Sequence, residues 1–179
     1  MKKILVISSS LRAKSNSQIL AESFAKGAGE AGHEVETVSL RGKDLKFCQG
    51  CLGCVKTGKC TIKDDAPEIV KKMHDADIIA FATPIYYYGM CGQMKTLLDR
   101  ANPLYGSGYR FTDIYMLSCA AENEPRVPER ALAGLGGWID CFDRARLAGS
   151  VFAGGVTEPD EIAGHPALKT AYELGKGIR

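Results

Sequence analysis

The stretch KILVISSSLRAKSNS, residues 3–17, decides the fold of this chain. Its first part, residues 3–8, is a short β-branched apolar run, which is typical of a central parallel strand buried on both faces. A polar loop follows, and after it Leu20, Phe24 and Ala28 recur at the spacing that places them on one face of a helix. A buried strand, a polar loop and an amphipathic helix together predict the opening unit of an α/β fold.

The same alternation continues along the whole chain. Further strands are predicted at residues 34–40, 77–83, 112–119 and 146–153, and further helices at residues 67–74, 93–101, 129–142 and 167–176. No linker, repeat or low-complexity stretch interrupts them. The pattern predicts a single domain over residues 1–179, built as a doubly wound, five-stranded parallel sheet with helices on both faces. The common strand order for such a sheet is 2-1-3-4-5, with the less apolar second strand at an edge.

Composition and charge restrict the class of partner. The 179 residues are 45% hydrophobic and 25% charged, which is typical of a globular domain. Because 23 Lys and Arg nearly balance 21 Asp and Glu, with no block of like charges, neither a nucleic-acid surface nor a polybasic membrane patch is predicted. The longest apolar run, residues 78–82, is far shorter than the roughly 20 residues of a membrane span. We expect a cytoplasmic protein that acts on a small molecule.

The topology also predicts where a ligand would bind. Ligands of doubly wound sheets lie beyond the carboxyl ends of the strands, at the point where the strand order reverses. The segments that leave those ends are residues 8–17, 40–65, 84–92 and 119–127. Nearly all the unusual chemistry of the sequence lies in these segments.

The first segment predicts an anion site. Residues 9–17 place serine hydroxyls, an amide and two cations where a helix begins. Free backbone N–H groups and the positive end of the helix dipole favour a phosphate there. The sequence contains neither G-x-G-x-x-G nor G-x-x-x-x-G-K-[ST], so a Rossmann dinucleotide and a nucleoside triphosphate are both disfavoured. The alternative is a solvated loop in which Ser15 and Gln18 form a capping box.

The third segment, within TPIYYYGMCGQMK at residues 83–95, predicts an aromatic pocket or interface. Three consecutive tyrosines cannot all lie in the core, because neighbouring side chains diverge and each hydroxyl needs a partner. Pro84, Gly89 and Gly92 are expected to let the loop backbone approach a planar ligand. The alternative is an aromatic turn packed on the sheet.

The second segment concentrates cysteine. Four of the seven cysteines lie within thirteen residues, at Cys48, Cys51, Cys54 and Cys60. An odd total and this clustering argue against a disulfide framework. The spacing is like the C-x2-C-x2-C start of ferredoxin cluster sites. Zinc fits worse, because structural zinc sites pair well-separated ligands, and a metal-free segment is the third interpretation. Asp64 and Asp65 are expected to start the following helix.

The three remaining cysteines are scattered singly through the chain. Cys91, Cys119 and Cys141 share no local motif with one another or with the cysteine cluster. We expect all three to be small buried hydrophobic residues.

Taken together, these motifs make the chain similar to the flavodoxin-like NAD(P)H-dependent FMN reductases and, among them, to the iron–sulfur flavoproteins. Residues 9–17 resemble the family's phosphate loop, G-S-x-R-x-x-[SG]-x-[ST], with Ser9 in place of the glycine. Residues 83–100 resemble the flavin loop and the helix after it. Residues 48–65 resemble the compact cysteine segment, and residues 153–175 resemble the closing stretch.

The resemblance implies a set of ligands for each cofactor. The residues implied to hold the FMN phosphate are Ser10, Arg12, Ser15, Asn16 and Ser17. Those implied to flank the isoalloxazine ring are Pro84, Ile85, Tyr86, Tyr87 and Gly89, with Ser118 and the loop after it on the other side. The residues implied to ligate a 4Fe-4S cluster are Cys48, Cys51, Cys54 and Cys60. We expect the cysteine segment to lie one or two strand spacings, ~4.8 Å each, from the strands that carry the flavin loops.

Four functions fit these expectations. The first is an FMN oxidoreductase that passes electrons from NAD(P)H to a quinone, free flavin or similar acceptor. The second is an iron–sulfur flavoprotein supplied by ferredoxin, the third an electron carrier without its own substrate, and the fourth a zinc-stabilised binding module. In a flavin enzyme the chemistry belongs to the cofactor, so no catalytic side chain is predicted. The adjacent tyrosines and Met90 present apolar area that predicts a homodimer or homotetramer.

Overall fold

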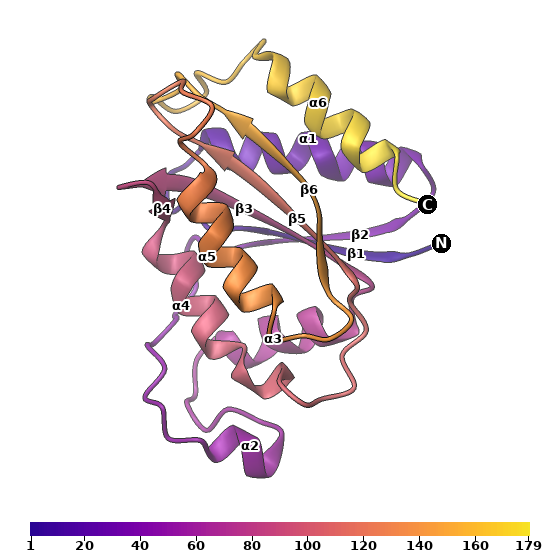
Figure 1. Cartoon of the computed structure of the whole chain (residues 1–179), viewed down its shortest axis with the longest axis vertical. Helices are drawn as coiled ribbons and strands as arrows, with labels where there is room; N and C mark the ends of the chain where they lie inside the picture. Colours follow the sequence, from indigo (N-terminus) through magenta and orange to yellow (C-terminus); the bar gives the residue numbers. More distant parts are fainter.

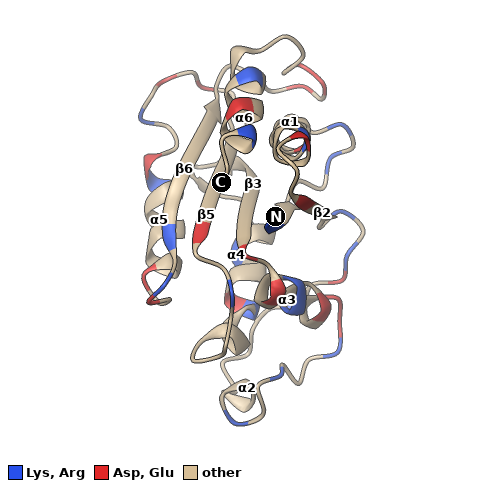
Figure 2. Ribbon diagram, turned by 90° about the vertical axis from the view of Figure 1, so that its right-hand side faces the viewer, with Lys and Arg blue, Asp and Glu red and all other residues tan.

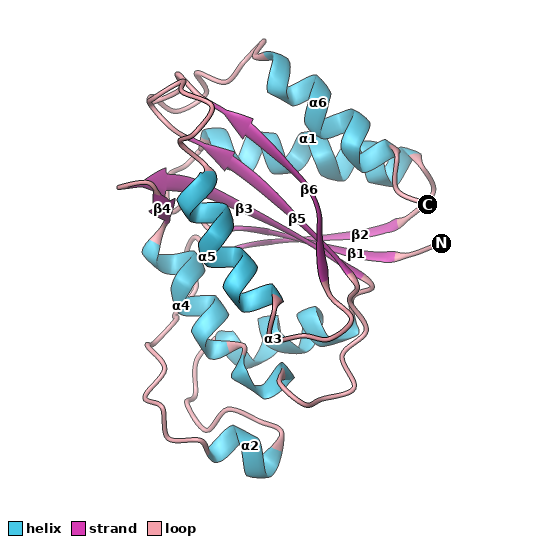
Figure 3. Cartoon of the chain, viewed as in Figure 1, coloured by secondary structure: helices cyan, strands magenta, loops and turns pink.

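The computed structural model describes residues 1–179 and contains one sheet between two layers of helices (Figures 1 and 3). Five strands run parallel in the order β2-β1-β3-β5-β6. Their bounds are β1 (Lys3–Ser8), β2 (Glu34–Ser39), β3 (Ile78–Tyr86), β5 (Asp113–Cys119) and β6 (Arg146–Ala153). Counted without β4, this is the predicted 2-1-3-4-5 order, so the doubly wound fold is confirmed, with β2 at an edge.

The predicted strand count is corrected from five to six. The additional strand, β4 (Gly89–Met90), is two residues long and pairs antiparallel with the end of β3. In the turn between them, Tyr87 and Tyr88 have positive φ angles of 49° and 65°. A two-residue type I′ hairpin needs positive φ at both central positions, which are usually Asn or Gly. The sequence lacks that signal, because the positive φ falls on the tyrosines and not on Gly89 or Gly92.

The helices cover both faces of the sheet (Figure 1). On one face lie α1 (Asn16–Glu30) and α6 (Pro166–Lys176). On the other lie α3 (Ala66–Asp75), α4 (Gly92–Arg100) and α5 (Glu129–Ile139). Two short segments, α2 (Gly53–Thr57) and the 3-10 turn η1 (Asn102–Leu104), were not predicted. Acidic and basic residues are interspersed over the ribbon (Figure 2), and no helix has the length and apolar character of a membrane span.

Two apolar clusters, one on each face, hold the sheet between its helices. Phe81 and Phe111 belong to the cluster under α3, α4 and α5, and Trp138 packs against both rings. On the other face α1 and α6 approach closely because both carry glycine at the contact. A Cβ at Gly175 would lie 2.2 Å from the carbonyl oxygen of Phe24, closer than any packing allows. This contact anchors the closing helix beside the helix that begins at the predicted phosphate loop.

Candidate functional site

A cleft opens at the carboxyl edge of the sheet, where the loops after β1, β3, β5 and β6 meet. Most of the predicted cofactor residues line it, namely Ser10, Arg12, Ser15, Asn16, Ser17, Pro84, Ile85 and Tyr86. These residues come from two segments that are far apart in the sequence, the loop after β1 with the start of α1, and the end of β3. The topology brings them together because β1 and β3 are hydrogen-bonded neighbours that end at the same edge.

Three predicted residues lie elsewhere in the structure. The ring of Tyr87 points into solvent and is fully exposed, while Gly89 belongs to the β4 hairpin. Ser118 is buried inside β5, and the residues after it line the cleft instead. Cys119, Ala120 and Ala121 belong to the segment after Ser118 that was expected at the site, whereas Val156, Thr157 and Pro159 were not predicted. The end of β6 reaches the same edge as the other strands, and this was the signal that could have pointed to residues 156–159.

The predicted phosphate site lies at the N-terminus of α1. Ser15 is the N-cap residue, and its Oγ accepts a hydrogen bond from the backbone N–H of Gln18 at 3.2 Å. The Gln18 side chain donates to Glu22 instead of returning to Ser15, so only half of a capping box forms. The Ser17 hydroxyl is buried and has no hydrogen-bond partner in the protein. A buried orphan hydroxyl at a helix N-terminus suits an anion that would accept from it.

Asn16 and Arg12 hold the segment after β6 against this loop. The Asn16 amide nitrogen donates to the carbonyl of Glu158 at 2.9 Å, and its oxygen accepts from the N–H of Ile162 at 3.1 Å. Arg12 donates to the carbonyl of Thr157 at 2.7 Å and lies 3.5 Å from the Glu158 carboxylate. The Asn16 amide is therefore already engaged, whereas the half-exposed Arg12 guanidinium keeps free N–H groups.

Ser9 replaces the glycine of the phosphate loop without strain. Its φ angle is not positive, so the backbone at this position does not require glycine. The buried hydroxyl donates to the carbonyl of Ala82 at 2.9 Å, and the sulfur of Cys91 lies 3.1 Å away. Cys91 is buried, and its backbone N–H donates to the Thr83 hydroxyl at 3.1 Å. Ser9 therefore holds the predicted phosphate loop against β3 and the start of α4.

The lining of the cleft includes one thiol, that of Cys119. Cys119 is buried at the end of β5, and burial raises the pKa of this thiol to about 12. Cys91 is also buried, but Cys141 is exposed, so the prediction that all three scattered cysteines are buried was wrong for Cys141. Cys141 follows the end of α5, where the chain turns through solvent before β6.

We expect Cys119 to resist alkylation in the native protein, while Cys141 reacts. At pH 8 a thiol of pKa about 12 holds roughly a thousandfold less thiolate than one at the ordinary 9.0. Peptide mapping after treatment with iodoacetamide at pH 8 measures both sites in one sample. Protein unfolded in guanidinium is the control and should be labelled at both positions. Equal labelling of Cys119 and Cys141 in the native protein would contradict the buried, neutral thiol.

The four clustered cysteines line a second cavity of about 320 Å³. This cysteine pocket lies at the C-terminal end of α4, and the other residues that form it include Asp99, Arg100, Asn102 and Pro103. All seven cysteines are free thiols. No three of the His, Cys, Asp or Glu side chains stand close enough together to hold a single metal ion.

Each sulfur of the cysteine pocket has a polar neighbour. The Gly50 N–H donates to Cys48 at 3.5 Å, and the Thr61 hydroxyl lies 3.9 Å from Cys51. The backbone N–H of Gly53, followed by Thr61, lowers the pKa of the Cys51 thiol. The other two sulfurs accept hydrogen bonds from side chains. Asn102 donates to Cys54 at 3.0 Å, and Arg100 donates to Cys60 at 3.4 Å.

The cysteine pocket does not lie where the topology predicted. It shares no lining residue with the cleft, and α4 stands between the two sites. The nine residues of α4 span roughly 13 Å. Residues 41–52 leave β2 and descend past α4 to the lower side of the molecule (Figure 1), so their distance from the flavin strands is not set by strand spacing.

Comparisons with known proteins agree with this architecture. The family model for NADPH-dependent FMN reductase matches residues 2–123. An iron–sulfur flavoprotein of Methanosarcina thermophila is 35% identical over 177 residues, which cover 96% of this chain and 93% of that protein. An iron–sulfur flavoprotein of Methanocaldococcus jannaschii is 42% identical over 102 residues, 57% of this chain. The chain spans about half the length of that relative, 53%.

A solved structure shares the fold at low identity. The NAD(P)H:quinone oxidoreductase from Methanothermobacter marburgensis superposes with a TM-score of 0.74 over 99% of both chains, at 18% identity. The family match covers well over half of the chain, and the Methanosarcina relative aligns over nearly all of it. The chain belongs to the NADPH-dependent FMN reductase family and groups within it with the iron–sulfur flavoproteins.

Proposed function

We propose that the protein binds FMN in the cleft and a 4Fe-4S cluster in the cysteine pocket. It would pass electrons from NAD(P)H or a protein donor to a quinone, a flavin or a similar small acceptor. Bound FMN supplies two-electron chemistry, and the protein supplies binding and orientation. The family to which the chain belongs supports this reading, since its description names both FMN and NADPH.

The observation that carries the FMN assignment is the unpartnered Ser17 hydroxyl at the start of α1. Residue Ser17 lines the cleft together with Ser10, Ser15 and the half-exposed Arg12. Backbone N–H groups at the helix start add further donors. One terminal phosphate could accept hydrogen bonds from all of these donors. The flavin ring would then lie between Ile85 on one side and the loop after β5 on the other. These residues fit a mononucleotide.

The cysteine pocket fits a cluster better than one zinc ion. Zinc–sulfur bonds of ~2.3 Å place the sulfurs of one zinc site within about 4 Å of each other. The cysteines here line a common cavity but do not converge to that degree. A cluster gives each thiolate its own iron, so wider spacing suits it, and it supplies one-electron transfer.

A second candidate function is an electron carrier that exchanges electrons with ferredoxin. The observation that favours it is the charge around the cysteine pocket. Exposed basic residues lie close to the cysteines in the sequence; they are Lys46, Lys56, Lys59 and Lys63. Basic residues of this kind attract an acidic protein partner and speed its association at low salt.

One preparation separates these functions. The protein is purified without oxygen, its absorption spectrum, flavin, iron and sulfide are measured, and NADH, NADPH or reduced ferredoxin is added. Steady turnover of a quinone with NAD(P)H supports the oxidoreductase. Reduction by ferredoxin alone, without turnover, supports the carrier. A colourless protein that binds neither flavin nor iron would contradict both.

The protein is expected to form a homodimer or a homotetramer. The cleft measures about 170 Å³, below the 300–1,000 Å³ typical of a small-molecule site, so part of the ring needs cover from elsewhere. Tyr86, which lines the cleft, is 52% exposed, and the next residue, Tyr87, is 101% exposed; aromatic residues of this kind suit interface cores. Sedimentation of the FMN-loaded protein at micromolar concentration measures its mass. A monomer would contradict the proposal.

A further inference from the structure

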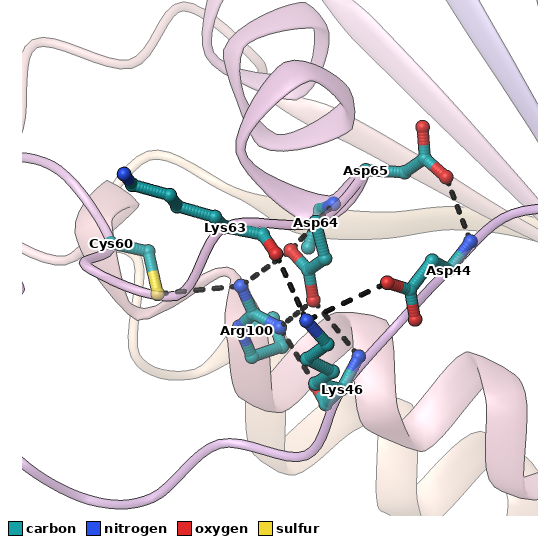
Figure 4. A network of polar contacts seen from close by, with 8 residues as sticks. Asp44, Lys46, Cys60, Lys63, Asp64, Asp65 and Arg100 are labelled. Atoms are coloured by element: carbon teal, nitrogen blue, oxygen red, sulfur yellow. Dashed lines mark hydrogen bonds and ion pairs between the residues drawn. The ribbon is translucent and has the colours of Figure 1, made fainter.

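The most deeply buried cation of the protein lies at the cysteine pocket. Arg100 is the last residue of α4, and its side chain and that of Asp64 are both fully buried. The guanidinium donates to both oxygens of Asp64, at 2.5 and 2.8 Å, and to the carbonyl of Lys46 at 2.7 Å (Figure 4). Burial alone would raise the pKa of Asp64, but the hydrogen bonds from Arg100 and from backbone N–H groups hold it below its ordinary value.

Besides pairing with Asp64, the guanidinium of Arg100 also donates a hydrogen bond to a cysteine sulfur. The Nη2 that contacts Asp64 also donates to the sulfur of Cys60 at 3.4 Å (Figure 4). Nε of Arg100 is buried and has no hydrogen-bond partner. The sequence-based prediction placed Asp64 at the start of the next helix, and its carboxylate does accept from the Ala66 N–H. Its second role, as the anchor for Arg100, was not predicted.

A second donor from the same end of α4 reaches another cysteine. Asn102 follows two residues after Arg100, and its amide nitrogen donates to the sulfur of Cys54 at 3.0 Å. The C-terminal end of a helix carries a negative partial charge, which disfavours thiolates close to it. Arg100 at that end opposes this charge. The C-terminal end of α4 therefore offers N–H groups to two of the four clustered sulfurs.

We propose that Arg100 and Asn102 are positioning residues that hold Cys60 and Cys54 for the cluster and raise its reduction potential. The inference rests on the proposed cluster. Hydrogen bonds to ligand sulfurs and nearby positive charge stabilise the more negative, reduced state more than the oxidised one. Since α4 begins directly after the β3–β4 hairpin, the same helix links the flavin loop to the cysteine pocket.

The variants are chosen to keep the fold. Removing Arg100 outright would leave Asp64 buried and unpaired, which is strongly destabilising. Arg100→Lys keeps a cation beside Asp64 but cannot reach carboxylate, carbonyl and sulfur together. Asn102→Ala removes the donor to Cys54 at an exposed position. Lys71→Met is the matched control, because it removes an exposed cation of α3 that pairs with Asp75, and neither residue lines the cysteine pocket.

Redox titration of the anaerobic protein, followed by visible absorption and electron paramagnetic resonance, measures the cluster potential. At fixed potential, the ratio of reduced to oxidised cluster should fall in each single variant and at least tenfold in the double variant. For a one-electron couple tenfold corresponds to about 59 mV. Both single variants should also release iron to a chelator faster, and Lys71→Met should match the wild type in both measurements.

The outcomes separate this inference from the proposed function. Wild-type protein that binds no iron without oxygen would overturn both. Wild-type and variant proteins that load equal iron, with equal potentials and release rates, would overturn only the role of Arg100 and Asn102. If Arg100→Lys does not fold, the measurements on Asn102→Ala alone test the inference, because Asn102 lies at the surface and its replacement should not disturb folding.

Discussion

Replacing Cys54 by serine is expected to lower bound iron from about four atoms per chain to nearly none, while FMN stays bound. Cys54 lines the cysteine pocket with the other three clustered cysteines, and a hydroxyl is a poor substitute for a thiolate on iron. FMN should remain because the cleft shares no lining residue with that pocket. Iron, sulfide and flavin analysis of anaerobically prepared protein measures all three quantities together.

Cys141→Ser is the matched control for this substitution. Cys141 is exposed and lies outside the cysteine pocket, so its replacement should leave iron and flavin unchanged. Full iron retention in Cys54→Ser would show that Cys54 is not a ligand. Wild-type protein that is free of iron but saturated with FMN would leave only the simple reductase function.

Riboflavin is expected to bind on the order of a hundredfold or more weakly than FMN. The two ligands differ only in the terminal phosphate, which would accept charge-assisted hydrogen bonds at the N-terminus of α1. Each such bond contributes about 1.5–3 kcal/mol, and about 1.4 kcal/mol is tenfold in affinity. Arg12→Ala should therefore weaken FMN roughly tenfold to a hundredfold and leave riboflavin affinity nearly unchanged. Titration of flavin fluorescence against apoprotein measures both ligands.

Lys14→Ala is the control for charge alone. Lys14 is exposed in the same loop but does not line the cleft, so its loss should change FMN affinity little. Equal affinity for FMN and riboflavin in the wild type would refute the phosphate assignment. Equal weakening of both flavins by Arg12→Ala would show instead that Arg12 acts by holding Thr157 and Glu158 in place.

The strand order and most of the cleft could be predicted because both follow from local patterns. Each buried strand is an apolar run, and each helix has one apolar face, so element type can be inferred without knowing what packs on it. Once the strands are parallel, their carboxyl ends must share an edge. That is why Ser10, Ser17 and Ile85 could be assigned to one cleft although they lie on different loops.

Other features depend on contacts that no local pattern records. The segment at residues 156–159 lines the cleft because Asn16 and Arg12 bind its backbone across more than 140 positions of sequence. The hairpin of Tyr87 and Tyr88 forms with residues that ordinarily avoid positive φ, so turn chemistry did not predict it.

The sequence by itself determined the doubly wound fold, the serine-rich loop at the start of α1 and the presence of four clustered cysteines. Only the tertiary structure decided where those cysteines lie and what surrounds them. Arg100 contacts Asp64 and Cys60, which lie 36 and 40 positions away in the sequence. No local sequence pattern predicts these contacts. The physical reason is that burying a cation requires an anion and hydrogen-bond acceptors at fixed distances, and only the packed chain brings them together.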